Sequence, residues 1–217
     1  MQHRASMSAN KPPSYDYNVF LNAPFDTEYL ALFRGLVFAI HDCGFICRCG
    51  LEVSNSADVR VQKLFSIIRE SRFGIHDISR VKLDRKHRLP HFNMPLELGF
   101  FLGARAFGSE LQRKKNCLVL DSERYRYQVF CSDLGGQDIK AHGNNVDDAV
   151  IAVRNWLSDA RAHRRGIIPG GKRMAQRYSE FCQYLPLACK RHQVSLRDLT
   201  FVDYRTLLTG WLQVNEW

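Results

Sequence analysis

The chain has 217 residues, of which 45% are hydrophobic and 24% charged, with 14 glycines and 7 prolines. These proportions are ordinary for a folded protein and exclude a low-complexity or collagen-like chain. The longest apolar stretch, residues 29–40, is interrupted by Arg34 and Gly35, so the sequence predicts no membrane-spanning helix. The formal net charge of +9 favours anionic ligands, either phosphates or nucleic acid, without choosing between them.

Residues 1–15 are polar and lack the apolar core of a secretory signal, so we expect a flexible leader and a cytoplasmic protein. The seven cysteines are an odd number, and several lie within apolar runs, where reduced thiols act as small hydrophobic side chains. Cys43, Cys47 and Cys49 are close in sequence, but no second Cys/His pair follows at zinc-ligand spacing. We therefore expect neither a metal site nor a cofactor.

Short apolar runs predict buried β-strands, and helical periodicity predicts the segments between them. The expected strands are residues 17–21, 45–49, 71–78 and 116–120, with 127–131 as a further strand or an extended edge piece. Helices are expected from residue 26 or 27 to 43, from 58 onwards, from 95 to about 107, and from 146 onwards. This alternation predicts an α/β fold with a doubly wound parallel sheet.

The last part of the chain differs in pattern from the rest. We interpret residues 169–217 as a small C-terminal helical appendage to an α/β domain of residues 16–168. Trp211, Leu212 and Trp217 near the end suggest a homo-oligomer or docking to an activating protein partner. The alternative is that these side chains cover an edge of the main domain.

Two carboxyl groups are the strongest candidates for chemistry. Ligands of doubly wound sheets bind beyond the carboxyl ends of the strands. Pro95 is typical of the first position of a helix, which would place Glu97 in the first turn, at this edge. Asp77 ends the preceding strand, so both carboxyl groups are expected to converge on one cleft, as glycosyl transfer requires of its acid, base or nucleophile.

Each charged candidate also has a simpler interpretation. A glutamate in a first helical turn can stabilise the helix dipole or bond a free backbone N–H. Arg48, at the end of the second strand, is a candidate phosphate ligand, but arginines at strand ends commonly lie in water. The basic segment from Arg80 to Arg88 is either a solvated loop or a contact for phosphate or nucleic acid.

Several motifs resemble known families. The chain opens with Val19-Phe20-Leu21-Asn22-Ala23-Pro24-Phe25, has Asp77 at the third strand's end, and begins a helix with Pro95-Leu96-Glu97-Leu98-Gly99. These motifs resemble the nucleoside 2-deoxyribosyltransferase-like superfamily, and Tyr17-Asn18-Val19-Phe20 is similar to the opening strand of Toll/interleukin-1-receptor (TIR) domains. The resemblance, which covers about residues 17–159, implies a flavodoxin-like sheet and a glutamate, Glu97, that attacks or stabilises the anomeric carbon of a ribose.

The resemblance also implies a reaction. The expected reaction is cleavage of the N-glycosidic bond of NAD+, as substrate and not cofactor, into nicotinamide and ADP-ribose, in a stress or phage-defence setting. Asp77 would hold a ribose hydroxyl or act as acid or base. Asn22 and Phe25 would contact the base or ribose, and Asn93 and Pro95 complete the expected substrate-binding residues.

Three alternatives remain open. The first is a non-catalytic nucleotide-sensing or TIR-like interaction module, which fits the presence of Phe92-Asn93-Met94-Pro95 where deoxyribosyltransferases carry Asp-x-Gly-Thr. The second is a nucleoside deoxyribosyltransferase. The third is a nucleic-acid-binding protein, suggested by the charge of +9, although the sequence has no helix-turn-helix, zinc-finger or RNP signature.

Overall fold

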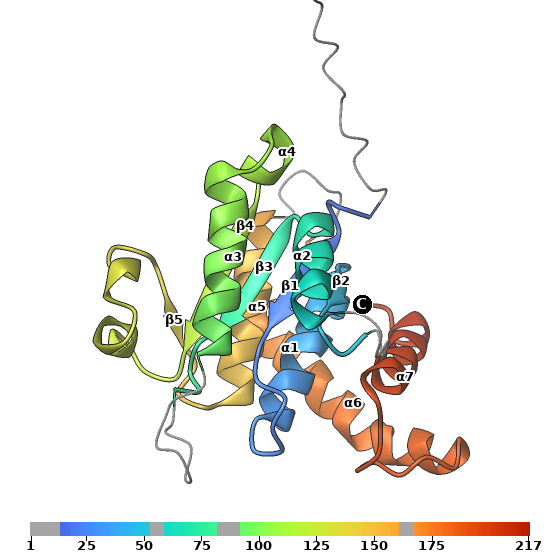
Figure 1. Ribbon diagram of the computed structural model, residues 1–217. Coiled ribbons are helices and arrows are strands. Elements are labelled where there is room, and N and C mark those ends of the chain that lie inside the picture. Colours follow the sequence, from blue (N-terminus) through green and yellow to red (C-terminus); the bar gives the residue numbers. More distant parts are fainter. Residues whose placement is uncertain (1–13, 53–58, 82–91, 161–166) are drawn as a thin grey trace, which may run out of the picture.

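The computed structural model describes residues 14–52, 59–81, 92–160 and 167–217. Within these residues, five parallel strands form one sheet in the order β2-β1-β3-β4-β5 (Figure 1). The strands are β1 (Asn18–Asn22), β2 (Ile46–Arg48), β3 (Phe73–Asp77), β4 (Asn116–Asp121) and β5 (Lys140–Ala141). This order and the parallel pairing confirm the predicted doubly wound, flavodoxin-like α/β sheet.

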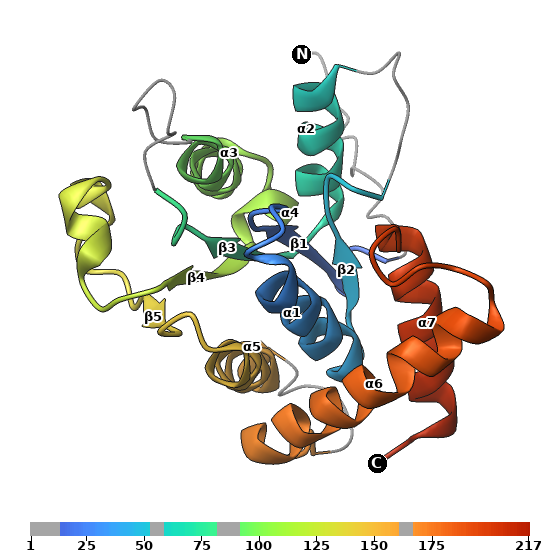
Figure 2. The same cartoon turned by 90° about the horizontal axis from the view of Figure 1, so that it is seen from below.

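Helices cover both faces of the sheet (Figure 2). One face carries α2 (Arg60–Glu70) and α3 (Asn93–Phe107), and the other carries α1 (Leu30–Asp42) and α5 (Val146–Ala160). The short helix α4 (Glu110–Arg113) follows α3, while α6 (Gly171–Arg191) and α7 (Phe201–Val214) pack outside α1. None of the described helices is long and apolar enough to cross a membrane.

The central strands and α1 form the main core. Every residue of β1 and β3 is buried, because helices cover the sheet on both faces. Helix α1 is buried on most of its surface, since the sheet lies on one side of it and α6 and α7 lie on the other. Gly35 allows α5 to approach α1 closely, because a Cβ at this position would lie 2.6 Å from Val146 Cγ1.

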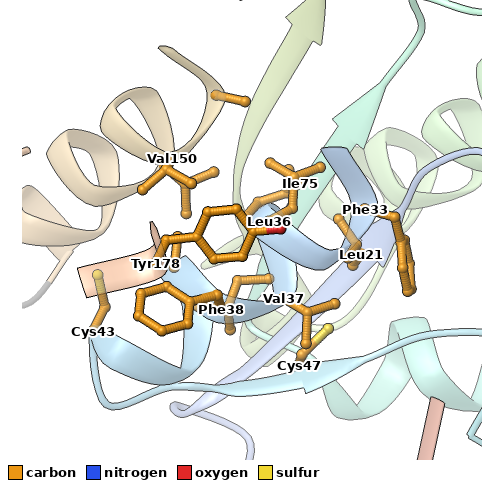
Figure 3. Close-up of a cluster of buried hydrophobic side chains, with 14 of the residues drawn as sticks. Leu21, Phe33, Leu36, Val37, Phe38, Cys43, Cys47, Ile75, Val150 and Tyr178 are labelled. Carbon is orange, nitrogen blue, oxygen red and sulfur yellow. The ribbon is translucent and has the colours of Figure 1, made fainter. Parts of the chain in front are cut away.

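The C-terminal helices share this core. Figure 3 shows Tyr178 of α6 and Val150 of α5 beside Leu36 and Phe38 of α1. The Tyr178 hydroxyl donates to the carbonyl oxygen of Ala31 at 3.2 Å. Trp211 of α7 is buried against Phe38, with ring centroids 6.0 Å apart. The C-terminal segment is therefore helical as predicted, with Trp211 buried against α1 and Trp217 51% exposed.

Other details of the predicted elements are corrected by the structure. Residues 127–131 are not a strand: Arg126–Val129 form a 3₁₀ helix, which turns Tyr127 and the partly buried Phe130, three residues later, onto the same apolar cluster. The strand at this edge is β5, which the sequence did not predict because two residues carry no periodicity. Helix α3 begins at Asn93, so Pro95 is its third residue and not its first.

A buried ion pair joins α1 to α6 and gives the first testable prediction. Arg177 donates to both carboxylate oxygens of Asp42 at 2.9 and 3.0 Å and to the carbonyl oxygen of Asn215 at 2.8 Å. We expect Arg177→Ala to lower the free energy of unfolding by about 3–5 kcal/mol, because Asp42 would remain buried without its partner. Arg173→Ala is the control, since Arg173 pairs with Glu180 at the surface, where such pairs contribute about 0–1 kcal/mol.

Urea denaturation followed by circular dichroism measures both variants. Equal losses for Arg177→Ala and Arg173→Ala would contradict the structural role of the buried pair.

Candidate functional site

The carboxyl edge of the sheet is held to α3 by Asn22, the last residue of β1. The Asn22 side-chain amide donates to the carbonyl oxygen of Met94 at 2.9 Å and contacts His76 Nδ1 at 3.1 Å. Since Nδ1 accepts from this amide, His76 is neutral with its proton on Nε2, and burial lowers the pKa of His76 to about 3. Asn22 thus fixes the first turn of α3 over the end of the sheet.

Glu97 lies in the second turn of α3 and faces inward. It shares one stripe of the helix with Phe101, four residues on, and Ala104, seven residues on. The Phe101 ring is fully buried against His76 at a centroid distance of 4.9 Å, so this stripe faces the sheet. Because Glu97 is the fifth residue of α3, and no acidic residue lies in its first turn, capping of the helix dipole does not explain Glu97.

Glu97 is a buried residue whose carboxyl group has no partner among the described residues. The residue is only 6% exposed, and the described part of the chain gives its carboxyl group no hydrogen bond and no ion pair. Burial raises the pKa of Glu97 to about 7, and the positive charge of Arg60 partly opposes this rise. A carboxyl group with this pKa exchanges its proton near neutral pH, which is the property that acid, base and cation-stabilising residues need.

Other polar atoms at the same edge are also unsatisfied among the described residues. Asn22 Oδ1, at the end of β1, and Ser79 Oγ, after β3, are buried and have no hydrogen-bond partner among these residues. Buried polar atoms are nearly always hydrogen-bonded in folded proteins. A ligand with hydroxyl groups, such as a sugar, would satisfy atoms of this kind.

Asp77 points to the opposite face of the sheet from Glu97. Successive strand residues alternate between faces, so Asp77 faces α1 while His76 faces α3. The Asp77 carboxylate accepts hydrogen bonds from the Tyr29 hydroxyl and from the backbone N–H of Ser79 at 2.8 Å. It also contacts His142 Nε2 at 3.0 Å. The expectation that Asp77 and Glu97 converge on one cleft is therefore not met.

The tautomer of His142 is fixed by its second ring nitrogen. The backbone N–H of Asn144 donates to His142 Nδ1 at 3.0 Å, so Nε2 carries the proton and donates to Asp77. The fully buried Asp77 carboxylate has three hydrogen-bond donors. Through them Asp77 joins the end of β3 to the residue after β5 and to the start of α1. No sequence motif indicates Tyr29 or His142, because both contact Asp77 from positions distant in the chain.

The remaining candidates lie away from Glu97 or have other partners. Phe25 packs against Phe33 of α1, with ring centroids 5.4 Å apart, on the face opposite α3. Arg48 pairs with Glu52 at 2.8 Å and with Glu70 at 3.3 Å, so two carboxylates already occupy its guanidinium group.

Two further expected residues lie in the first turn of α3. Asn93 is exposed there and Pro95 is partly buried. Of the basic segment, Arg80 pairs with Asp26 and Glu28, and residues 82–91 lie outside the described part of the chain.

The clustered cysteines do not form a reactive centre. Cys47 and Cys49 are buried, and burial raises the pKa of the Cys47 thiol well above its usual value and the pKa of the Cys49 thiol to about 12. Thiols of this kind stay protonated at neutral pH, whereas nucleophiles and metal ligands are thiolates. Among the described residues, no three His, Cys, Asp or Glu side chains gather in a group that could hold a metal ion.

Comparison of the chain with protein-family models, with curated proteins and with solved structures gave no match. The functional interpretation therefore depends on the geometry of the site and on the sequence motifs.

The raised pKa of Glu97 makes stability depend on pH. The folded protein binds this proton more tightly than the unfolded chain, whose glutamate titrates near 4.5, so stability falls as pH rises from about 4.5 to about 7. Glu97→Gln removes this loss. We expect the stability of Glu97→Gln relative to wild type to increase by about 3 kcal/mol across the window, at about 1.4 kcal/mol per pKa unit.

Chemical denaturation of both proteins at pH 5 and pH 8 measures the change. A difference that is the same at both pH values would show that Glu97 titrates normally.

Proposed function

We propose that this protein cleaves the N-glycosidic bond of NAD+, releasing nicotinamide and ADP-ribose, with Glu97 as the catalytic residue. The observation that carries the proposal is the carboxyl group of the buried residue Glu97, which lies at the carboxyl edge of the sheet, has no partner among the described residues and has a pKa of about 7. Structural carboxylates are normally paired, as Asp77 and Asp42 are in this protein. The Glu97 carboxyl group is thus suited to bind a positively charged or hydrogen-bond-donating group of a ligand.

The chemistry needs little beyond such a carboxylate. When the bond between C1′ and the nicotinamide nitrogen breaks, its electron pair neutralises the positive charge of the ring, so the leaving group needs no proton. The sugar becomes an oxocarbenium-like cation, and an ionised Glu97 would stabilise that charge in a site of low dielectric constant. Water then forms a bond to C1′ and loses one proton, for which Glu97 is the acceptor.

The sequence motifs support the same reaction. Glu97 follows Pro95-Leu96 on the helix after β3, which is the place of the glutamate in TIR-like and deoxyribosyltransferase-like proteins. The parallel sheet order agrees with the flavodoxin-like fold that this resemblance implies.

One observation favours a second candidate function, nucleotide binding without turnover. Asp77 has three hydrogen-bonding partners and faces away from Glu97, so the site lacks the paired carboxyl groups typical of glycoside hydrolysis. A site that only recognises a nucleotide needs no such pair. The two functions differ in whether product forms.

Turnover by Glu97→Gln tests the proposal. We expect the wild type to release nicotinamide from NAD+ and Glu97→Gln to be at least about 100-fold slower, because an amide cannot carry the stabilising charge. Product formation is followed by chromatography, with folding of the variant checked by circular dichroism. Glu110→Gln is the matched control, since Glu110 is an exposed residue of α4 beyond the far end of α3, and its rate should equal that of the wild type.

The pH profile gives a second test of the role of Glu97. Because the ionised form is required, kcat/KM should rise with pH and level off above about 7, the pKa of Glu97. Equal rates for wild type and Glu97→Gln would refute catalysis by Glu97. If concentrated wild-type protein binds NAD+ but leaves it intact, the binding function replaces the enzymatic one.

A further inference from the structure

Helices α2 and α3 lie on the same face of the sheet, with the axis of α2 inclined to that of α3 (Figure 2). The rings of Phe65 and Phe100 are in contact, with centroids 5.0 Å apart. A cavity of about 420 Å³ between the helices is lined by Ile68 and Arg69 from α2 and by Gly103 and Ala104 from α3. The ring contact and the residues that line the cavity give the same register: a residue of α2 lies beside the residue about 35 positions later in α3.

The same register places the first turn of α2 beside Glu97. Counting back from the contact of Phe65 with Phe100 by about one turn leads towards Val61 and Gln62 on α2 and towards Leu96 and Glu97 on α3. The first residue of α2, Arg60, is therefore a neighbour of the Glu97 turn. The influence of its charge on the Glu97 carboxyl group agrees with this placement.

Arg60 differs from the other arginines at this edge. Arg48 and Arg80 are both engaged in ion pairs with carboxylates. Arg60 is exposed and, within the described residues, has no ion pair or hydrogen bond. It also begins a helix whose N-cap residue, Val59, has no side-chain oxygen and whose first turn contains no acidic residue.

A second observation indicates that a ligand belongs at this place. The neighbouring Glu97 is more than nine-tenths buried and unpartnered among the described residues, and its helical stripe faces the junction of α2, α3 and the sheet. Arg60 and Glu97 would therefore act on one bound molecule. The combination of a guanidinium group with the free N–H groups of a helix start suits a phosphate.

We propose that Arg60 and the first turn of α2 bind a phosphate group of the ligand whose ribose contacts Glu97, so that the site selects nucleotides over nucleosides. The inference rests on the proposed placement of ribose at Glu97. In a nucleotide the base is attached at C1′ and the phosphate at the 5′ carbon, at opposite ends of one sugar. Glu97 and Arg60, on adjacent helices, would contact these two ends.

The test uses two ligands that differ only by the 5′ phosphate, nicotinamide mononucleotide and nicotinamide riboside. Binding of each is measured by isothermal titration calorimetry with the full chain carrying Glu97→Gln, which prevents turnover. We expect the mononucleotide to bind at least about tenfold more tightly than the riboside, since charged hydrogen bonds are among the stronger ones. Adding Arg60→Ala should remove about this factor for the mononucleotide and leave the riboside within about twofold.

Arg69→Ala is the matched control. Arg69 is an exposed arginine in the last turn of the same helix, so it should change neither affinity. Arg60→Lys, which retains the charge but not the planar fork, should give an intermediate affinity for the mononucleotide.

The inference is overturned if the mononucleotide does not bind, if Arg60→Ala weakens both ligands equally, or if it weakens neither. These outcomes are separate from those of the proposed function. If the protein prefers the phosphorylated ligand through Arg60 but releases no nicotinamide, the phosphate site is supported and the proposed glycosidase activity is refuted. If the protein releases nicotinamide but Arg60→Ala leaves the phosphate preference unchanged, the glycosidase activity is supported and the phosphate site at Arg60 is refuted.

Discussion

The last two residues of β3 hold the two faces of the sheet at its carboxyl edge. Because side chains alternate along a strand, His76 points to α3 and Asp77 points to α1. His76 contacts Asn22, which in turn fixes the first turn of α3 through Met94. On the other face, Asp77 accepts hydrogen bonds from the Tyr29 hydroxyl and the His142 ring. The position of Glu97 therefore depends on polar contacts on the α3 face, while the Asp77 contacts fix the framework beneath it.

The contrast between the two acidic residues explains why only one is assigned to chemistry. Asp77 is fully buried, and three hydrogen-bond donors contact its carboxylate. Glu97 is also buried, but no donor within the described residues offsets the loss of water, so its ionisation opposes folding. Unsatisfied groups of this kind persist in proteins mainly where function requires them. The proposed site therefore rests on the unsatisfied carboxyl group of Glu97.

Much of the fold could be predicted from the sequence because the buried strands are apolar runs and the helices are amphipathic. The strand β5 was not predicted, because its two residues, Lys140 and Ala141, have no apolar pattern. The start of α3 was predicted two residues late, since its N-cap, Phe92, carries no capping side chain. Glu97 lies on the helix after β3, as the sequence predicts, but the direction of Asp77 follows from strand alternation and from partners distant in the chain. The pairing of Arg48 with Glu52 and Glu70 is likewise a tertiary contact.

The central proposal is that Glu97, a buried residue whose carboxyl group is unpaired among the described residues, contacts a ligand. It is tested most directly by a nuclear magnetic resonance titration of the Glu97 side-chain carboxyl carbon, assigned with Glu97→Gln, in the free protein and with ADP-ribose. The structure predicts a midpoint near pH 7 and a change in the resonance when ADP-ribose is added. A midpoint near 4.5, with a resonance that does not respond to ADP-ribose, would contradict it.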